Sequence, residues 1–268
     1  MGEKMSNAPI YFALAQVRFN TILALEQYLP VIQDGLRKSG YPDFEKGFVG
    51  IINLSFGQER PPSGNVPSMQ PQARYSFYNL EKTSGFILDQ SMMTFQTTEY
   101  DVFETFSKEF LKGIDMVHET ASLSYSERIG VRYLDAVLPT KDETLSHYLV
   151  PSIMGLYDKL APRQLIQSHS ETRTKDGNTN LVSRAFIMLQ ERAGNVAFPA
   201  DLTPIEMHIN EKFRNIKGLY GIIDTDSWLE EREKFVISGI ERRLDILHTE
   251  LRRSFDMMVT PYALEMWK

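Results

Sequence analysis

Apolar residues recur at every second position in several segments of the chain, and this period of two predicts β-strands. In residues 11–19 one face is wholly apolar and carries Tyr11, Ala13, Ala15, Val17 and Phe19. Further strands are predicted at 48–56 and 127–139 and within 73–81, 84–100, 162–191, 204–210 and 219–228. Asp176-Gly177 separates two alternating runs, which is a strong signal for a β-hairpin.

Two longer segments have apolar residues spaced by three and four, the period of an amphipathic helix. The first, at about 101–120, carries Val102, Phe106, Phe110, Ile114 and Val117. The second, at about 231–258, carries Val236, Ile240, Leu244, Leu247 and Leu251. A shorter helix is expected to begin near Pro30, to bury Val31, Ile32 and Leu36, and to end at Gly40. Residues 145–161 are expected to be helical except at Pro151.

The two long helices contain similar phrases, "IDMVHETASLSY" at 114–125 and "LDILHTELRRSF" at 244–255. Asp115 matches Asp245, Val117 matches Leu247, and His118 matches His248. Each helix follows a predicted strand with a Gly-apolar-apolar triplet, at 85–87 and at 221–223. This similarity is either a true internal repeat or a coincidence between two amphipathic helices.

These elements predict an α+β fold of two related halves, each a curved antiparallel sheet with a long amphipathic helix packed across it. Residues 1–140 are the first half, and residues 141–268 are the second half with the long C-terminal helix. The first half includes a long proline-rich loop at 57–73, which has four prolines and no hydrophobic period. That loop is either a tolerated insertion or a functional segment.

Composition narrows the functional classes. The net charge of −6 argues against a dedicated nucleic-acid binder, which normally needs a basic surface. The absence of cysteine excludes disulfides, thiolate metal sites and cysteine nucleophiles, and it fits a cytoplasmic location. No apolar run precedes Ile10, so no secretory signal is expected, and no segment is apolar for long enough to predict a membrane span.

Known catalytic and metal motifs are missing from the sequence. It has no phosphate-binding glycine loop and no Gly-x-Ser-x-Gly motif, so no catalytic residue is assigned. The five histidines, His118, His147, His169, His208 and His248, do not form a His-Glu-x-x-His pair, and neither a metal nor another cofactor is expected. His118 and His248 either approach each other in a duplicated fold or are polar residues at the flanks of their helices.

Charged residues in predicted strands supply a candidate ligand site. Gln167, His169, Glu171 and Arg173 share one face of a very polar strand, which is either part of a binding groove or the solvent side of a hairpin. Arg18 and Arg132, in "QVRF" and "GVRY", are either exposed or partly buried anchors for an anion. Asp224 and Asp226 either bind a cation or perform acid–base work, or they form a turn or cap the following helix.

The C-terminal segment "FDMMVTPYALEMWK" predicts a short helix that Thr260 caps and Pro261 begins. It carries four large apolar side chains, Tyr262, Leu264, Met266 and Trp267. They either fold back onto the core or dock into a partner or a second copy of this chain.

The segments "SNAPIYFALAQVRFNTILALEQYLPVIQDGLRKSGYPDF" and "FDMMVTPYALEMWK" together resemble a sporadically distributed bacterial family of uncharacterised proteins of similar length. The likeness runs from Asn7 to Trp267 and rests on "PIYFALAQVRF" and on the terminal Thr-Pro followed by a tryptophan. Because these words carry no catalytic motif, the resemblance transfers no active site. Its patchy distribution implies an accessory or mobile-element role, such as defence or toxin neutralisation.

The leading functional hypothesis is a non-catalytic cytosolic binding or regulatory protein that acts on another macromolecule, either a protein partner or a second copy of this chain. The alternative is an enzyme or sensor that binds a small anionic ligand in the cleft between the two halves. Arg18, Arg132, His169 and Arg173 would then be the main ligand contacts. Nucleic-acid binding ranks below both because of the net charge, and no membrane partner is expected.

Overall fold

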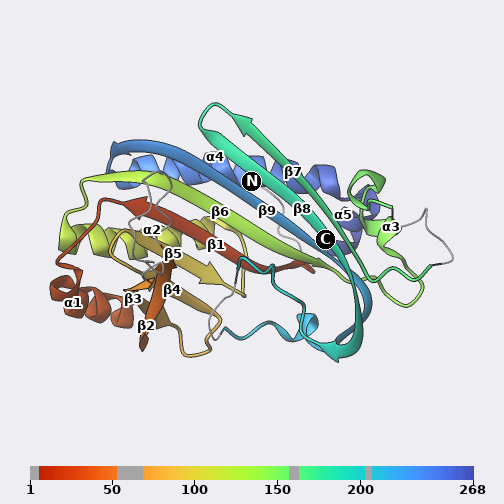
Figure 1. Ribbon diagram of the computed structural model, residues 1–268, viewed down its shortest axis with the longest axis horizontal. Coiled ribbons are helices and arrows are strands. Elements are labelled where there is room, and N and C mark those ends of the chain that lie inside the picture. Colours follow the sequence, from red (N-terminus) through yellow and green to blue (C-terminus); the bar gives the residue numbers. More distant parts are fainter. Residues whose placement is uncertain (1–5, 53–68, 157–162, 203–206) are drawn as a thin grey trace, which may run out of the picture.

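In the part of the chain that the structure describes, nine strands form one antiparallel sheet (Figure 1). The computed structural model describes residues 6–52, 69–156, 163–202 and 207–268 and confirms the predicted α+β class. The strands are β1 (Ile10–Phe19), β2 (Asp43–Ile52), β3 (Met69–Tyr78), β4 (Ser84–Leu88), β5 (Met92–Thr97), β6 (Tyr125–Val137), β7 (Gln167–Asp176), β8 (Thr179–Gly194) and β9 (Ile216–Lys234). Their spatial order is β2-β3-β4-β5-β1-β6-β9-β8-β7.

Helices cover one side of this sheet, which we call the helix face (Figure 1). The α-helices are α1 (Leu25–Lys38), α2 (Phe103–Ala121), α3 (Leu145–Tyr148), α4 (Ile237–Met258) and α5 (Pro261–Trp267). α2 and α4 lie side by side against the central strands, α1 packs on α2, and α3 packs on α5. The opposite side of the sheet, which we call the open face, is covered in part by the segment between β8 and β9.

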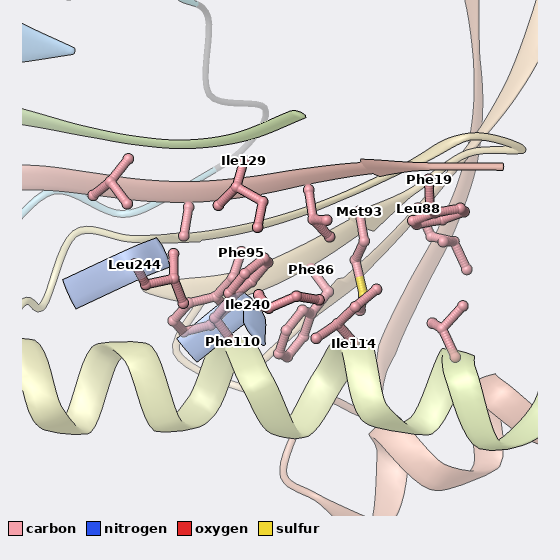
Figure 2. Close-up of a cluster of buried hydrophobic side chains, with 14 of the residues drawn as sticks. Phe19, Phe86, Leu88, Met93, Phe95, Phe110, Ile114, Ile129, Ile240 and Leu244 are labelled. Atoms are coloured by element: carbon pink, nitrogen blue, oxygen red, sulfur yellow. The ribbon is translucent and has the colours of Figure 1, made fainter. Parts of the chain in front are cut away.

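The main core lies between the helix face and these helices because the apolar stripes of both long helices point to the sheet. Figure 2 shows Phe110 and Ile114 of α2 packed with Phe86 and Phe95 of the sheet and with Ile240 and Leu244 of α4. Gly113 allows close packing of α2, since a Cβ atom there would lie 2.2 Å from the Phe86 ring. The predicted positions of both helices are therefore confirmed to within a few residues, apart from the start of α4.

On both sides of the central β1–β6 pair, the neighbouring strands follow one another outward in reverse order along the chain. On one side β5, β4 and β3 follow β1, and on the other side β9, β8 and β7 follow β6. β2 lies beyond β3, and the described residues contain no matching strand beyond β7. The predicted division near residue 140 falls just after β6, and the sheet continues across it because β6 pairs with both β1 and β9.

Several predicted boundaries were wrong. α1 begins at Leu25, so Pro30 lies inside it and Val31 is exposed. β9 extends to Lys234, so α4 begins only at Ile237 and Val236 is exposed. The two errors have different causes: α1 begins earlier because Leu25 is buried in the core, whereas the exposed end of β9 continues as a strand because it pairs with the start of β6.

Three other predicted segments differ from the structure in part. Of the expected strand at 204–210, residues 207–210 have no strand structure, and residues 204–206 lie outside the described residues. Residues 69–73 of the predicted proline-rich loop belong to β3, and its residues 57–68 lie outside the described part of the chain. Within the predicted helical segment 145–161, α3 ends at Tyr148 and a short 3₁₀ turn begins at Pro151; residues 157–161 are not described.

The predicted hairpin and C-terminal helix are present. Gly177 adopts a φ of 53° at the turn between β7 and β8, a conformation that glycine adopts without strain. Thr260 accepts a hydrogen bond from the Ala263 N–H, and Pro261 is the first residue of α5. Trp267 is buried against Tyr148 and Phe255, so it folds back onto the protein.

The rest of α5 is less covered, and the chain end is held by the N-terminal segment. Leu264 is half-buried, whereas Tyr262 and Met266 are exposed. The N–H groups of Ser6 and Asn7 donate hydrogen bonds to the carbonyl groups of Lys268 and Trp267. None of the described helices is long and apolar enough to cross a membrane.

Candidate functional site

A pocket of about 130 Å³ opens on the helix face between the sheet and α4. β6 and β9 form its floor, α4 forms one wall, and the segments that precede α2 and begin β1 form the others. Its apolar lining comes from Pro9, Ile10, Val102, Phe103, Leu251 and Phe255. Its polar groups include Tyr100, Tyr133, Asp135, Thr225, His248 and Arg252. We call this site the Asp135 pocket.

Asp135 is the central polar group of this pocket. Its side chain is on β6 and is only 6% exposed, and no hydrogen bond to its carboxyl group occurs within the described residues. Burial raises the pKa of Asp135 to about 7, Arg252 opposes that shift, and the charge of Asp224 adds to it. A carboxyl group without a hydrogen-bonding partner is unusual in a folded interior.

Thr225 is a second unsatisfied group in the pocket wall. It lies on β9 opposite Tyr133 of β6, and its buried Oγ1 atom has no hydrogen-bond partner among the described residues. A buried hydroxyl group without a partner costs about 1–3 kcal/mol.

Aromatic residues and His248 form the rim of the pocket. The His248 ring stacks on Phe103 with 4.0 Å between centroids, and its Nδ1 atom lies 3.2 Å from the Tyr133 hydroxyl group. Burial lowers the pKa of His248 and raises the pKa values of Tyr100 and Tyr133. At neutral pH these three side chains are therefore uncharged.

The open face carries a different polar arrangement, a line of alternating charges that crosses β6, β9, β8 and β7. It consists of Asp201, Arg132, Asp224, Arg184, Glu171 and Arg173, and we call it the arginine–carboxylate chain. Its members are joined by contacts of 2.6–3.0 Å. It contains three arginines and three carboxylates, so its formal charges balance.

Arg132 is the best-satisfied member of this chain. Its Nε and Nη2 atoms donate to the two carboxylate oxygens of Asp224 at 2.8 and 2.7 Å, and its Nη1 atom donates to Asp201 at 2.9 Å. Burial lowers the pKa of Arg132, but the hydrogen bonds to Asp224 and Asp201 outweigh that effect and hold it above its ordinary value. The guanidinium group is thus committed to two carboxylates.

The six predicted ligand residues all lie on strands of the open face, but only some of them meet. Arg132, Glu171 and Arg173 belong to the arginine–carboxylate chain. His169 stacks on Phe186 at 4.4 Å, and both His169 and Gln167 are exposed on the edge strand β7. Arg18 is exposed on β1 and does not join the chain; Arg128 lies opposite it on β6. The exposed alternative for Arg132 is wrong because Arg132 is 6% exposed.

The predicted cap at Asp224 and Asp226 is wrong. Both residues lie inside β9, far from the start of α4. Asp224 is fully buried in ion pairs with Arg132 and Arg184. Asp226 has no hydrogen-bond partner in the described ranges, and burial raises its pKa.

His118 and His248 do not contact each other. Each stacks on a phenylalanine at or just before the start of the other long helix. His118 stacks on Phe235, which immediately precedes the start of α4, at 4.5 Å. His248 stacks on Phe103, the first residue of α2. Among the residues that the structure describes, no group of three or more histidine or carboxylate side chains is placed to hold a metal ion.

Sequence reasoning did not identify the Asp135 pocket, although one signal was available. In the predicted strand 127–139, Asp135 shares a face with Ile129, Val131, Tyr133 and Val137. A single carboxylate on an otherwise apolar strand face indicates either a buried ion pair or a ligand site. The covering elements, α4 and the segments before β1 and α2, could not be placed from the strand alone.

Comparison of the sequence with models of known protein families gives no match, and a comparison with curated proteins finds no significant match either. Functional inference therefore rests on the geometry of the chain itself.

Proposed function

We propose that this protein binds a small organic ligand in the Asp135 pocket and acts as a sensor or carrier. The observation that carries the proposal is Asp135, a carboxylate only 6% exposed that lines a mainly apolar pocket without a hydrogen bond among the described residues. Concave apolar sites with a few convergent polar groups are the usual form of ligand pockets.

The geometry supports binding in preference to a reaction. Tyr100, Tyr133 and His248 are uncharged at neutral pH and can hold fixed hydrogen-bonding roles. Asp135 is the only group of the described pocket lining whose raised pKa, about 7, lies near neutrality. A reaction would need a second group of matched acidity or a nucleophile beside it.

We also propose that the chain consists of two related halves and that the pocket forms where they meet. The outward strand order from β1 and β6 supports this proposal, as does the reciprocal stacking of His118 on Phe235 and His248 on Phe103. Segments from both sides line the pocket, since β1 and the segment before α2 face β9 and α4. Superposition of β3–β5 with α2 on β7–β9 with α4 tests the relation.

A regulatory role toward another macromolecule remains a prediction, and a ligand sensor would fit it. Of the four C-terminal residues predicted to dock, Trp267 is buried, Leu264 is half-buried, and Tyr262 and Met266 stay exposed one helical turn apart. The accessory or defence role implied by the resemblance would also require action on another macromolecule.

The test of ligand binding is native mass spectrometry of the protein purified from its own host, with wild type compared to Val102→Phe. Val102 is the N-cap of α2 and lines the pocket, so a larger side chain should fill it. Val236→Phe is the matched control, because Val236 is the exposed N-cap of α4, outside the pocket lining. We expect a small bound molecule in wild type and in Val236→Phe that is lost in Val102→Phe. Equal occupancy in all three proteins, or none, contradicts the proposal.

A further inference from the structure

We propose that the ligand of the Asp135 pocket is a small primary amine with one apolar group, bound as its ammonium ion against Asp135. This inference rests on the proposed function and adds the chemical class of the ligand.

The charges around the pocket favour a cation. Among the described residues of its lining, the charged groups are three carboxylates, Asp101, Glu104 and Asp135, and one arginine, Arg252. Arg252 is itself 3.0 Å from Asp256 in an ion pair on the exposed side of α4. Since the histidine of the rim is uncharged, the excess charge of the lining is negative.

The position of Asp135 specifies where the cation would bind. It is the only one of the three carboxylates that is buried, whereas Asp101 and Glu104 are exposed. A buried carboxylate that lacks a donor gains most from a ligand that brings both a positive charge and hydrogen-bond donors. An ammonium group has three donors, and the two carboxylate oxygens of Asp135 can accept two of them.

The walls suit the remainder of such a ligand. Tyr100, Phe103 and Tyr133 present aromatic rings around the site, and aromatic rings attract cations within about 6 Å of their centres. Leu251 and Phe255 of α4 supply apolar contacts for a ring or a branched alkyl group. The volume of about 130 Å³ accommodates one such group and no large conjugate.

The anionic ligand predicted from the sequence lacks a comparable place. The predicted arginine anchor Arg132 lies on the open face and is already bonded to Asp224 and Asp201. Arg173 is likewise paired with Glu171 at 2.6 Å. An anion would have to displace carboxylates that the protein itself supplies.

The experiment is isothermal titration calorimetry of the full chain at pH 8 with three probes of similar shape. These probes are 2-phenylethylamine, 2-phenylethanol and 3-phenylpropanoate. We expect the amine to bind at least tenfold more tightly than the alcohol and the carboxylate not to bind. Asp135→Asn should weaken the amine at least tenfold, and Asp226→Asn should leave it unchanged. Asp226 is a suitable control because its carboxyl group also has a burial-raised pKa but lies on the open face.

Each result decides the inference separately from the proposed function. Preference for the alcohol or the carboxylate, or equal amine binding by Asp135→Asn, overturns the amine assignment and leaves the pocket as a ligand site. Failure of the amine at millimolar concentration also overturns the assignment. Loss of selectivity in a folded Asp135→Asn protein, shown by an unchanged circular dichroism spectrum, supports it.

Discussion

Each face of the sheet contains a buried carboxylate, and the two carboxylates have opposite hydrogen-bonding environments. On the open face, Asp224 of β9 is fully buried and bonded to two arginines from neighbouring strands. On the helix face, Asp135 of β6 is buried without a hydrogen bond to any described residue, and its pKa rises to about 7. The first arrangement is complete within the protein. The second has no hydrogen-bonding partner among the described residues, and this difference separates a structural ion pair from a candidate ligand site.

The largest expected change in stability comes from removing the buried ion pair between Arg132 and Asp224 on the open face. Arg132→Leu should lower the free energy of unfolding by about 3–5 kcal/mol, because it leaves Asp224 buried with only Arg184 as a counter-charge. Urea unfolding followed by circular dichroism measures the change. Arg173→Leu, at the exposed end of the same chain, is the control and should have no measurable effect. A loss below 1 kcal/mol for Arg132→Leu would mean that the buried pair is not strongly coupled.

The second effect concerns the unsatisfied side and depends on pH. The pKa of Asp135 is about 7 in the folded protein, above its ordinary value of 3.8, so the folded state holds this proton more tightly. Its contribution to stability is therefore present below about pH 4 and is lost as the pH rises to about 7. Asp135→Asn should be more stable than wild type at pH 8, by up to about 4 kcal/mol, and similar to it at pH 4.

Parallel urea unfolding of both proteins between pH 4 and pH 8 measures this difference. Burial also raises the pKa of Asp226, so Asp226→Asn should show a pH dependence of the same sign. A difference between wild type and Asp135→Asn that does not vary with pH would contradict the raised pKa.

A smaller effect is expected at Thr225. Thr225→Val keeps the shape and removes a buried hydroxyl group that has no partner among the described residues, so it should raise the free energy of unfolding by about 1 kcal/mol. Ser183→Ala is the contrasting change, because the Ser183 hydroxyl group lies 2.6 Å from that of Ser254. We expect that variant to lose about 1 kcal/mol. Thermal unfolding measures whether each variant is more or less stable than wild type. Destabilisation by Thr225→Val would show that the Thr225 hydroxyl group has a hydrogen-bonding partner.

The smallest effect is expected at Arg18. Its side chain is exposed on β1 and does not join the arginine–carboxylate chain. Arg18→Gln should leave both the melting temperature and the binding of 2-phenylethylamine unchanged. A measurable loss of amine binding would connect the open face to the pocket and weaken the contrast between the two sides.

The periodic strands and helices could be predicted because the side chains that they bury recur at regular spacings in the local sequence. The apolar alternation of residues 11–19 and the helical spacing in α2 are visible without knowledge of neighbours. Asp224 and Asp226 misled for the opposite reason. Aspartate is unfavourable in strands, and β9 tolerates Asp224 only because Arg132 and Arg184 lie on the two adjacent strands. That compensation links residues 40 and 92 positions apart along the chain.

The candidate site depended even more on distant parts of the chain. Asp135 belongs to a strand that was predicted correctly, yet its unusual environment is created by α4 and by the segments before β1 and α2. Charged residues of the open face were prominent in the sequence because they alternate with small polar residues. Of the six residues predicted to bind a ligand, the structure shows that Arg132, Glu171 and Arg173 are already paired with other charged side chains of the protein.

The central position of β1 has a consequence for how the protein reaches this structure. The first strand of the chain pairs with β5 and with β6, whose last residue is Val137, and β6 must then pair with β9. Distant pairings of this kind slow folding because long loops must close first. The only two tryptophans, Trp228 and Trp267, lie in β9 and α5. Tryptophan fluorescence during refolding should therefore report the late assembly of the C-terminal third and miss the earlier pairing of β3, β4 and β5, which only backbone circular dichroism would detect.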